Sequence, residues 1–369
     1  MKIIVCLLFL YITILPQEKS RIQLRDGKIF DKGIELNEQS PNAPEELRKL
    51  SPLIGEWNVI IKSKTGDSTY HTSSGISRFS YLNRGHSIME KFYCDDFTGK
   101  GDELNTLSFI AYNSQNKIWN IGLADSYKEN IVMFTGKTSD EDLILFNSIR
   151  KGGWLNIHRY KYSLKNISNV NFEITVELSI DDSNEWVLIQ QKQYKKVKNS
   201  LNIIFENDSF GSYNNSLPEE ARQFDFLIGE WDASHELFLP NGNHIKYSST
   251  TTAVYTMNGN AIMEHDWFDA RQGVTDAGTS LIRIYNRAMR RWECLFLSNR
   301  NNANYYFGGV KEEDKIVLHG FETDVSSPAY NYFIFYNLSE NDYSWHSIQT
   351  KDKGKTFSDT WTIEVEKKN

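Results

Sequence analysis

The chain has 369 residues, of which 13% are aromatic and 24% are charged, and this composition excludes an intrinsically disordered protein. Its 48 acidic side chains outnumber its 41 basic ones, so the formal net charge of −7 gives no basic surface for nucleic acid. The length suggests two domains or one large one.

The first predicted element is a secretory signal peptide. One lysine precedes an apolar run over residues 3–15, which is too short to span a bilayer comfortably. We therefore expect residues 1–17 to direct the protein to a secreted or periplasmic location, without membrane insertion once they are removed; an uncleaved anchor is the alternative. Cys94 and Cys294 would then remain in the mature chain, and we expect both to be buried free thiols.

A five-residue string, LIGEW, occurs at residues 53–57 and again at residues 227–231. The residues around it recur in the same order: Pro44-Glu45-Glu46 matches Pro218-Glu219-Glu220, Ile88-Met89-Glu90 matches Ile262-Met263-Glu264, and Tyr112-Asn113 matches Tyr285-Asn286. A repeat of this length is too long for a solenoid, so each unit should be a domain with its own core. The predicted organisation is a leader segment at 18–43, a first domain at 44–198, a linker at 199–217 and a second domain at 218–369.

Within each unit the hydrophobic residues recur at every second position. Residues 171–180 alternate between polar and apolar side chains, as expected of a strand with one buried face. The convincing helical pieces are the short segments before each LIGEW, where Pro44 or Pro218 can begin a turn. Many short strands with little helix predict an all-β fold, either an antiparallel barrel or a sandwich.

The succession of helical turn, Gly-x-Trp and first strand resembles the opening of lipocalin-like barrels. The second unit resembles an uncharacterised lipocalin-like (calycin-type) family through FDFLIGEWD, NGNAIMEHDW, GTSLIRIYNRAMRRW and KDKGKTFSDTW, in that order. The resemblance implies two tandem antiparallel lipocalin-like β-barrels, each preceded by a short helix. Many lipocalins place a last-strand arginine on the Gly-x-Trp ring. Here the closing strands end in Lys195-Lys196 and Lys367-Lys368, so we do not carry that contact over.

Candidate site residues follow from the faces of these strands. By alternation Glu90 and Glu264 share a face with apolar neighbours, where a carboxylate is costly unless paired. Each is interpreted either as a ligand contact or base or, more simply, as a glutamate hydrogen-bonded to neighbouring strands. The candidate lumen residues are Trp231, His235, Glu264, Trp292, Phe307 and Trp345 in the second unit, and Trp57, Glu90 and Trp119 in the first. Tyr305 is a further inward aromatic candidate.

The histidines suggest chemistry only in the second unit. His235 lies on the face of Trp231 and His265 follows Glu264, whereas the first unit has Ile61 and Lys91 at these positions. A structural or surface role is the simpler interpretation of each histidine. No spacing typical of a metal site occurs, and we predict no cofactor.

Three functions stay open at this point. The preferred one is an exported, non-enzymatic binding protein that holds a small hydrophobic ligand in a barrel, most plausibly the second. The alternatives are an enzyme, such as an isomerase or hydrolase on an apolar substrate with Glu264 and His235 or His265, and a protein or glycan interaction module with filled barrels. Sequons at Asn166, Asn207, Asn214 and Asn337 matter only if the host glycosylates exported proteins.

Overall fold

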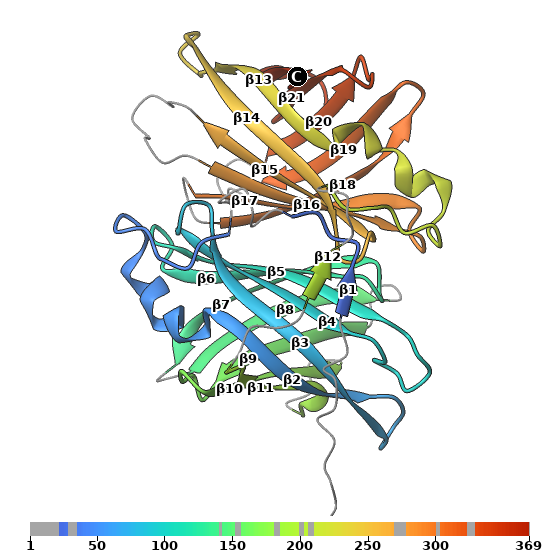
Figure 1. The fold of residues 1–369 in the computed structure, drawn as a ribbon. Helices are drawn as coiled ribbons and strands as arrows, with labels where there is room; N and C mark the ends of the chain where they lie inside the picture. Colours follow the sequence, from blue (N-terminus) through green and yellow to red (C-terminus); the bar gives the residue numbers. More distant parts are fainter. Residues whose placement is uncertain are drawn as a thin grey trace, which may run out of the picture.

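The computed structural model describes residues 22–28, 35–139, 142–151, 156–180, 185–198, 203–205, 210–268, 278–299, 303–322 and 329–368. Within these ranges the chain forms two closed antiparallel β-barrels, each of ten strands, which Figure 1 shows stacked one above the other. The prediction of an all-β fold with two tandem antiparallel barrels is confirmed. The strand number is higher than in lipocalins, whose barrels have eight strands. The predicted signal peptide and Asn207 lie outside the described residues.

The first barrel consists of β2 (Gly55–Lys64), β3 (Tyr70–Leu82), β4 (Ser87–Cys94), β5 (Leu104–Asn113), β6 (Ile118–Asp125), β7 (Asn130–Ser139), β8 (Asp142–Lys151), β9 (Asn156–Lys165), β10 (Asn171–Ile180) and β11 (Val187–Lys196). Each strand pairs with the next along the chain, and β11 closes the barrel against β2. The equivalent strands of the second barrel are β13 (Gly229–Phe238), β14 (His244–Thr256), β15 (Ala261–Phe268), β16 (Gly278–Asn286), β17 (Arg291–Ser298), β18 (Ala303–Glu312), β19 (Lys315–Glu322), β20 (Ala329–Tyr336), β21 (Asp342–Thr350) and β22 (Ser358–Lys367). Here β22 closes against β13.

The helical segment before each barrel is present but is 3-10 rather than α-helical. It spans η2 (Glu45–Leu53) before the first barrel, and η3 (Glu219–Arg222) and η4 (Asp225–Leu227) before the second. No helix in the described part of the chain is long and apolar enough to cross a membrane.

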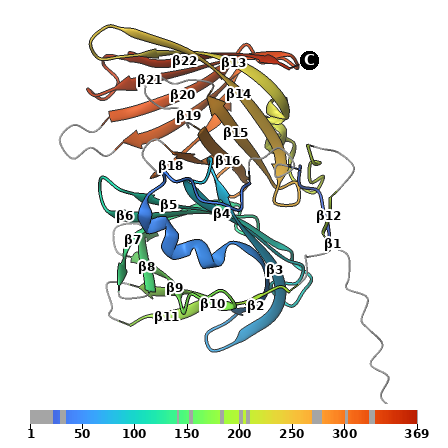
Figure 2. The ribbon, with the colours of Figure 1, turned by 60° about the vertical axis from the view of Figure 1, so that its left-hand side comes forward.

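The leader and the linker pair with each other instead of running separately. Strand β1 (Ile22–Leu24) in the leader lies parallel to β12 (Ile203–Phe205) in the linker, beside the two barrels in Figure 2. The leader then contacts both barrels: the Gly27 amide donates to the Tyr255 carbonyl at 2.8 Å, and the Leu36 amide to that of Tyr81 at 2.8 Å. These segments therefore help to hold the barrels together.

The barrels meet through a third apolar cluster, which we call the inter-barrel core. It contains Leu82, Met89, Leu107, Phe109, Ala111, Ala124 and Ile131 from the first barrel and Val254, Met257, Ala261, Met263, Ile282, Ile284, Leu295 and Leu297 from the second. Equivalent positions occur on both sides, because the repeat aligns Met89 with Met263. Gly122 aligns with Leu295, and these two residues face each other, since a Cβ added at Gly122 would lie 2.3 Å from Leu295 Cδ1. The duplicated units thus pack like the two copies of a symmetric dimer.

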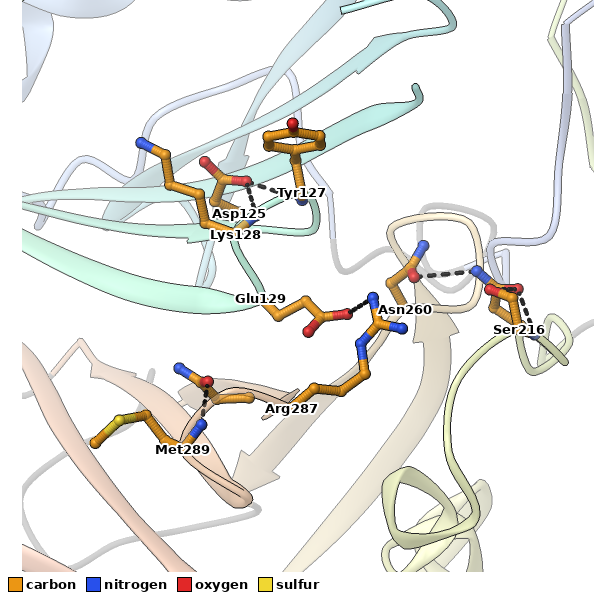
Figure 3. Close-up of polar contacts among 10 residues, drawn as sticks. Asp125, Tyr127, Lys128, Glu129, Ser216, Asn260, Arg287 and Met289 are labelled. Carbon is orange, nitrogen blue, oxygen red and sulfur yellow. Dashed lines mark hydrogen bonds and ion pairs between the residues drawn. The ribbon is translucent and has the colours of Figure 1, made fainter. Parts of the chain in front are cut away.

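Polar contacts surround this inter-barrel core. Glu129 of the first barrel and Arg287 of the second form an ion pair of 2.5 Å (Figure 3). The Asn304 side-chain amide donates to the Phe109 carbonyl at 3.0 Å, and Glu293 accepts from the Ile131 amide at 2.9 Å. Cys94 and Cys294 lie in different barrels, both buried and free, as the sequence predicts.

Candidate ligand site in the second barrel

The two LIGEW segments close one end of each barrel. The Trp231 indole donates to the Leu227 carbonyl at 2.6 Å, and the Trp57 indole donates to the Leu53 carbonyl at the same distance. Both tryptophans are fully buried. Because each ring is fixed under its 3-10 segment, it acts as a plug of the barrel. Neither ring lines the cavity described below, although both were candidate lumen residues.

The closing lysines take the place that many lipocalins give to arginine. Lys196 Nζ lies 4.4 Å from the Trp57 ring centroid, and Lys367 Nζ lies 5.5 Å from that of Trp231. The sequence does not predict an arginine on these rings, and the structure places a lysine there, which also makes a cation–π contact. The glycine of LIGEW leaves room for it: Gly55 has a φ of +122°, and a Cβ there would lie 2.6 Å from Lys196 Nζ.

The second barrel contains a cavity of about 260 Å³. Its aromatic wall comprises Phe296, Phe307, Phe333, Phe335, Trp345 and Trp361, and its polar lining includes His235, Thr251, Glu264, Asp266, Arg283 and Asn331. Tyr305 also lines it and is 38% exposed, so the cavity reaches solvent beside β18. Of the predicted second-unit residues, His235, Glu264, Phe307 and Trp345 line this cavity.

Trp292 does not belong to this lining. It is buried against Phe224 of the segment that closes the barrel, with ring centroids 4.8 Å apart, and its indole donates to Gln223 Oε1 at 3.2 Å. Trp292 therefore holds in place the segment that closes this end of the barrel.

Three inward positions of the first barrel carry larger side chains than their equivalents in the second. The strand registers align Val59 with Ala233 and Tyr194 with Val365, and they align Phe79 with Ala253. At each position the first barrel has the larger side chain. Its rings pack closely: Tyr194 stacks on Phe172 with centroids 4.1 Å apart. Ala233 and Val365, which line the cavity, therefore leave space that Val59 and Tyr194 occupy in the first copy. At other lining positions the second copy has the larger residue, as where Trp345 aligns with Ile174.

Glu90 and Trp119 belong to the interior of the first barrel. Glu90 is 2% exposed and accepts hydrogen bonds from Ser77 Oγ at 3.0 Å and from the Tyr194 hydroxyl at 2.7 Å. The simpler interpretation, a glutamate hydrogen-bonded to neighbouring strands, describes it. Trp119 packs edge-to-face on Tyr112 with centroids 5.2 Å apart.

Glu264 lies in a cluster of ionisable groups on the cavity wall. Arg283 Nη1 lies 2.8 Å from Glu264 Oε2, and both side chains are largely buried. Asp266 accepts hydrogen bonds from Thr251 Oγ1 at 2.5 Å and from Thr279 Oγ1 at 2.6 Å. Burial, together with the negative charge of Glu264, raises the pKa of Asp266 to about 7, although the two threonine hydroxyls and Arg283 act in the opposite direction. This cluster therefore holds two carboxyl groups and one guanidinium.

His235 is held in one tautomer by its neighbours. The Trp361 indole, which is only a donor, lies 3.1 Å from His235 Nδ1, so that nitrogen accepts and carries no proton. His235 Nε2 lies 2.6 Å from Ser249 Oγ, and the ring stacks on Tyr247 with centroids 4.6 Å apart. Both ring nitrogens therefore have protein partners, an arrangement typical of a structural histidine.

His265 points away from the lumen, toward the first barrel. Its Nδ1 lies 2.7 Å from Ser280 Oγ, which in turn donates to Asn83 Oδ1 of the first barrel at 2.7 Å. Burial, helped by Arg84, lowers the pKa of His265 to about 3. Adjacent residues on a strand face opposite sides, so the hypothesis that pairs Glu264 with His265 in one catalytic site is wrong.

Sequence reasoning missed Arg283, Phe333 and Trp361 in the lining. Alternation along β16 was the available signal for Arg283, because Leu281 and Arg283 both line the cavity. Arg283 falls within the segment GTSLIRIYNRAMRRW, which we use for the family resemblance, and a single arginine on a mostly apolar strand does not by itself indicate an inward charge. In the described ranges, no group of three or more His, Cys, Asp or Glu side chains is placed to hold a metal ion.

Comparisons with known proteins identify no family. No family model matches the chain, and no curated protein matches it. Among solved structures, it is similar to the crystal structure of a protein of unknown function from the DUF3598 family of Nostoc punctiforme. The match has 10% sequence identity and a TM-score of 0.29, and it covers 88% of this chain and 100% of that one. At that TM-score the similarity carries no argument about function.

Proposed function

We propose that this chain is a non-enzymatic binding protein that holds a small hydrophobic molecule in the lumen of its second barrel, while the filled first barrel supports it. The observation that carries the proposal is the cavity of about 260 Å³ with an aromatic wall, in which Ala233 and Val365 stand where the first copy has Val59 and Tyr194. An apolar hollow inside a folded protein leaves dispersion contacts unmade, and a ligand that fills it restores them.

The cavity volume bounds the size of the ligand. An engineered apolar cavity of about 150 Å³ holds benzene, so 260 Å³ accommodates a molecule of about ten non-hydrogen atoms. At about 0.5–0.6 kcal/mol per atom such a ligand binds with roughly −5 to −6 kcal/mol, which corresponds to a Kd of roughly 40–200 μM.

The two alternatives have less support. An enzyme using Glu264 and His235 would need a histidine nitrogen aimed at substrate, whereas Trp361 and Ser249 engage both. An interaction module with filled barrels would leave no lumen, whereas the second barrel has a cavity of about 260 Å³.

The proposal includes export through residues 1–17 and a distant relationship of both barrels to the lipocalin-like family. Export is supported by the apolar run after the first lysine, and the relationship by the Gly-x-Trp plug with its lysine contact. N-terminal sequencing of the protein recovered from its host tests export: a start near residue 18 is expected, and an intact Met1 contradicts it.

The binding proposal is tested by isothermal titration calorimetry of the full chain with 3-phenylpropanol, a neutral probe of ten non-hydrogen atoms. Binding of one molecule per chain is expected for the wild type. It should be lost in Val365→Tyr, which introduces the Tyr194 ring of the first barrel, and retained in Asp232→Asn, an exposed change on the same barrel. Equal binding by wild type and Val365→Tyr refutes the lumen as the site, and so does a wild type that binds neither this alcohol nor the amine or carboxylate with the same phenylpropyl body.

A further inference from the structure

The ionisable groups on the cavity wall differ in how far they are engaged by other protein groups. Arg283 is 3% exposed and is paired with Glu264 at 2.8 Å. Its guanidinium carbon also lies 5.1 Å from the Phe224 ring centroid and 5.5 Å from that of Phe335. Its Nε is buried and has no hydrogen-bond partner within the protein, so the ion pair with Glu264 is the contact that engages its charge. The guanidinium of Arg283 is therefore held by one ion pair and two aromatic rings.

Asp266 is available to a ligand. Its two oxygens each accept one threonine hydroxyl, and a carboxylate oxygen can accept a second hydrogen bond. Asp266 and Glu264 both line the cavity and keep part of their surface accessible. Since Glu264 is balanced by Arg283, the ionised form of Asp266 is the uncompensated charge in this cluster.

This charge pattern discriminates between ligand classes. A carboxylate would have to displace Glu264 from Arg283 and would approach Asp266, a like charge in a poorly solvated site. A protonated amine would meet two carboxylates and donate to the unused positions on Asp266. The aromatic wall, which includes Trp345, Trp361 and Phe333, adds to this preference, because an aromatic ring face attracts a cation.

We propose that the occupant is an amine: a small apolar or aromatic molecule of about ten non-hydrogen atoms with one protonated nitrogen against Asp266 and Glu264. Its apolar body lies between the aromatic side chains, beside Phe307 and Phe333, whose ring centroids are 4.8 Å apart. This inference rests on the proposed function, because it specifies the chemistry of the ligand of that same lumen.

The test compares three probes that share one phenylpropyl body and differ in the end group: 3-phenylpropylamine, 3-phenylpropanol and 3-phenylpropanoate. Each is titrated into the full chain by isothermal titration calorimetry at pH 8. We expect the amine to bind at least tenfold more tightly than the alcohol, and the carboxylate at least tenfold more weakly than the alcohol. In Asp266→Asn the amine should fall to the affinity of the alcohol, and the affinity of the alcohol should be unchanged.

Asp232→Asn is the matched control, since it removes an exposed acid from the same barrel and should preserve the order of the probes. An alcohol or carboxylate that binds wild type as tightly as the amine overturns the amine assignment and leaves the binding function standing. Failure of all three probes to bind overturns both. The wild-type series decides the matter even if Asp266→Asn does not fold.

Discussion

Ala233 and Val59 are equivalent positions on the first strands of the two barrels, and exchanging their side chains should change stability in opposite directions. Val59 is 1% exposed in the filled first barrel, whereas Ala233 lines the cavity of the second. Ala233→Val adds two methylene equivalents to empty apolar space, and Val59→Ala removes the same two from a packed core.

The magnitudes follow from the packing. Burying two methylenes at about 0.8 kcal/mol each stabilises Ala233→Val by about 1.5 kcal/mol before side-chain entropy, and by about 1 kcal/mol after it. Val59→Ala loses the same transfer term and leaves a cavity of about 50 Å³, which at about 24 cal/mol per Å³ raises its total cost to about 2–3 kcal/mol.

Urea denaturation followed by far-UV circular dichroism measures both effects. The midpoint should rise for Ala233→Val and fall for Val59→Ala, with unchanged m-values. Ala233→Val should also weaken 3-phenylpropanol binding, because the same space serves both. A destabilised Ala233→Val with a normal m-value would mean that the second lumen is already packed, and the account of the cavity would fail.

Three further predictions concern charge and the contact between the barrels. Glu264→Gln leaves Arg283 buried without its ion partner and should lower the free energy of unfolding by about 3 kcal/mol. Adding Arg283→Met in a double variant should restore part of this loss. If the losses of the two single variants simply add in the double variant, the pair does not interact. Asp266 has a folded pKa of about 7 against an ordinary 3.8, so its stabilising contribution is complete below pH 4 and is lost as pH rises toward 7. Asp266→Asn should therefore gain stability relative to wild type between pH 5 and pH 8 in urea titrations, and a constant difference would contradict the raised pKa. Gly122→Ala places a Cβ 2.3 Å from Leu295 Cδ1, so this buried side chain must move, and the substitution should lower the thermal midpoint at a cost of about 1–3 kcal/mol. Leu295→Ala should rescue it in the double variant, and a double variant in which the two effects simply add would contradict the contact.

The repeat and the alternation of side chains predicted two all-β domains, and the resemblance to lipocalin-like barrels predicted that each domain is a barrel. Two copies of LIGEW in matched surroundings indicated two domains, and the period of two indicated strands with one buried face. These signals are local, because the pleat places alternate residues on opposite faces wherever the strand lies. The same alternation already implied that Glu264 and His265 face different sides.

Only the tertiary structure decided which barrel is hollow, because that depends on side chains that meet across strands far apart in the chain. Ala233 and Val365 are neighbours through the pairing of β13 with β22, and their combined small size leaves space that neither predicts alone. Pairing across β15 and β16 likewise placed Arg283 on Glu264. The inter-barrel core had no sequence signature either: Met89 and Met263 look like ordinary strand residues until the outer faces of the two barrels come together, because burial of an outward side chain is a property of what packs against it.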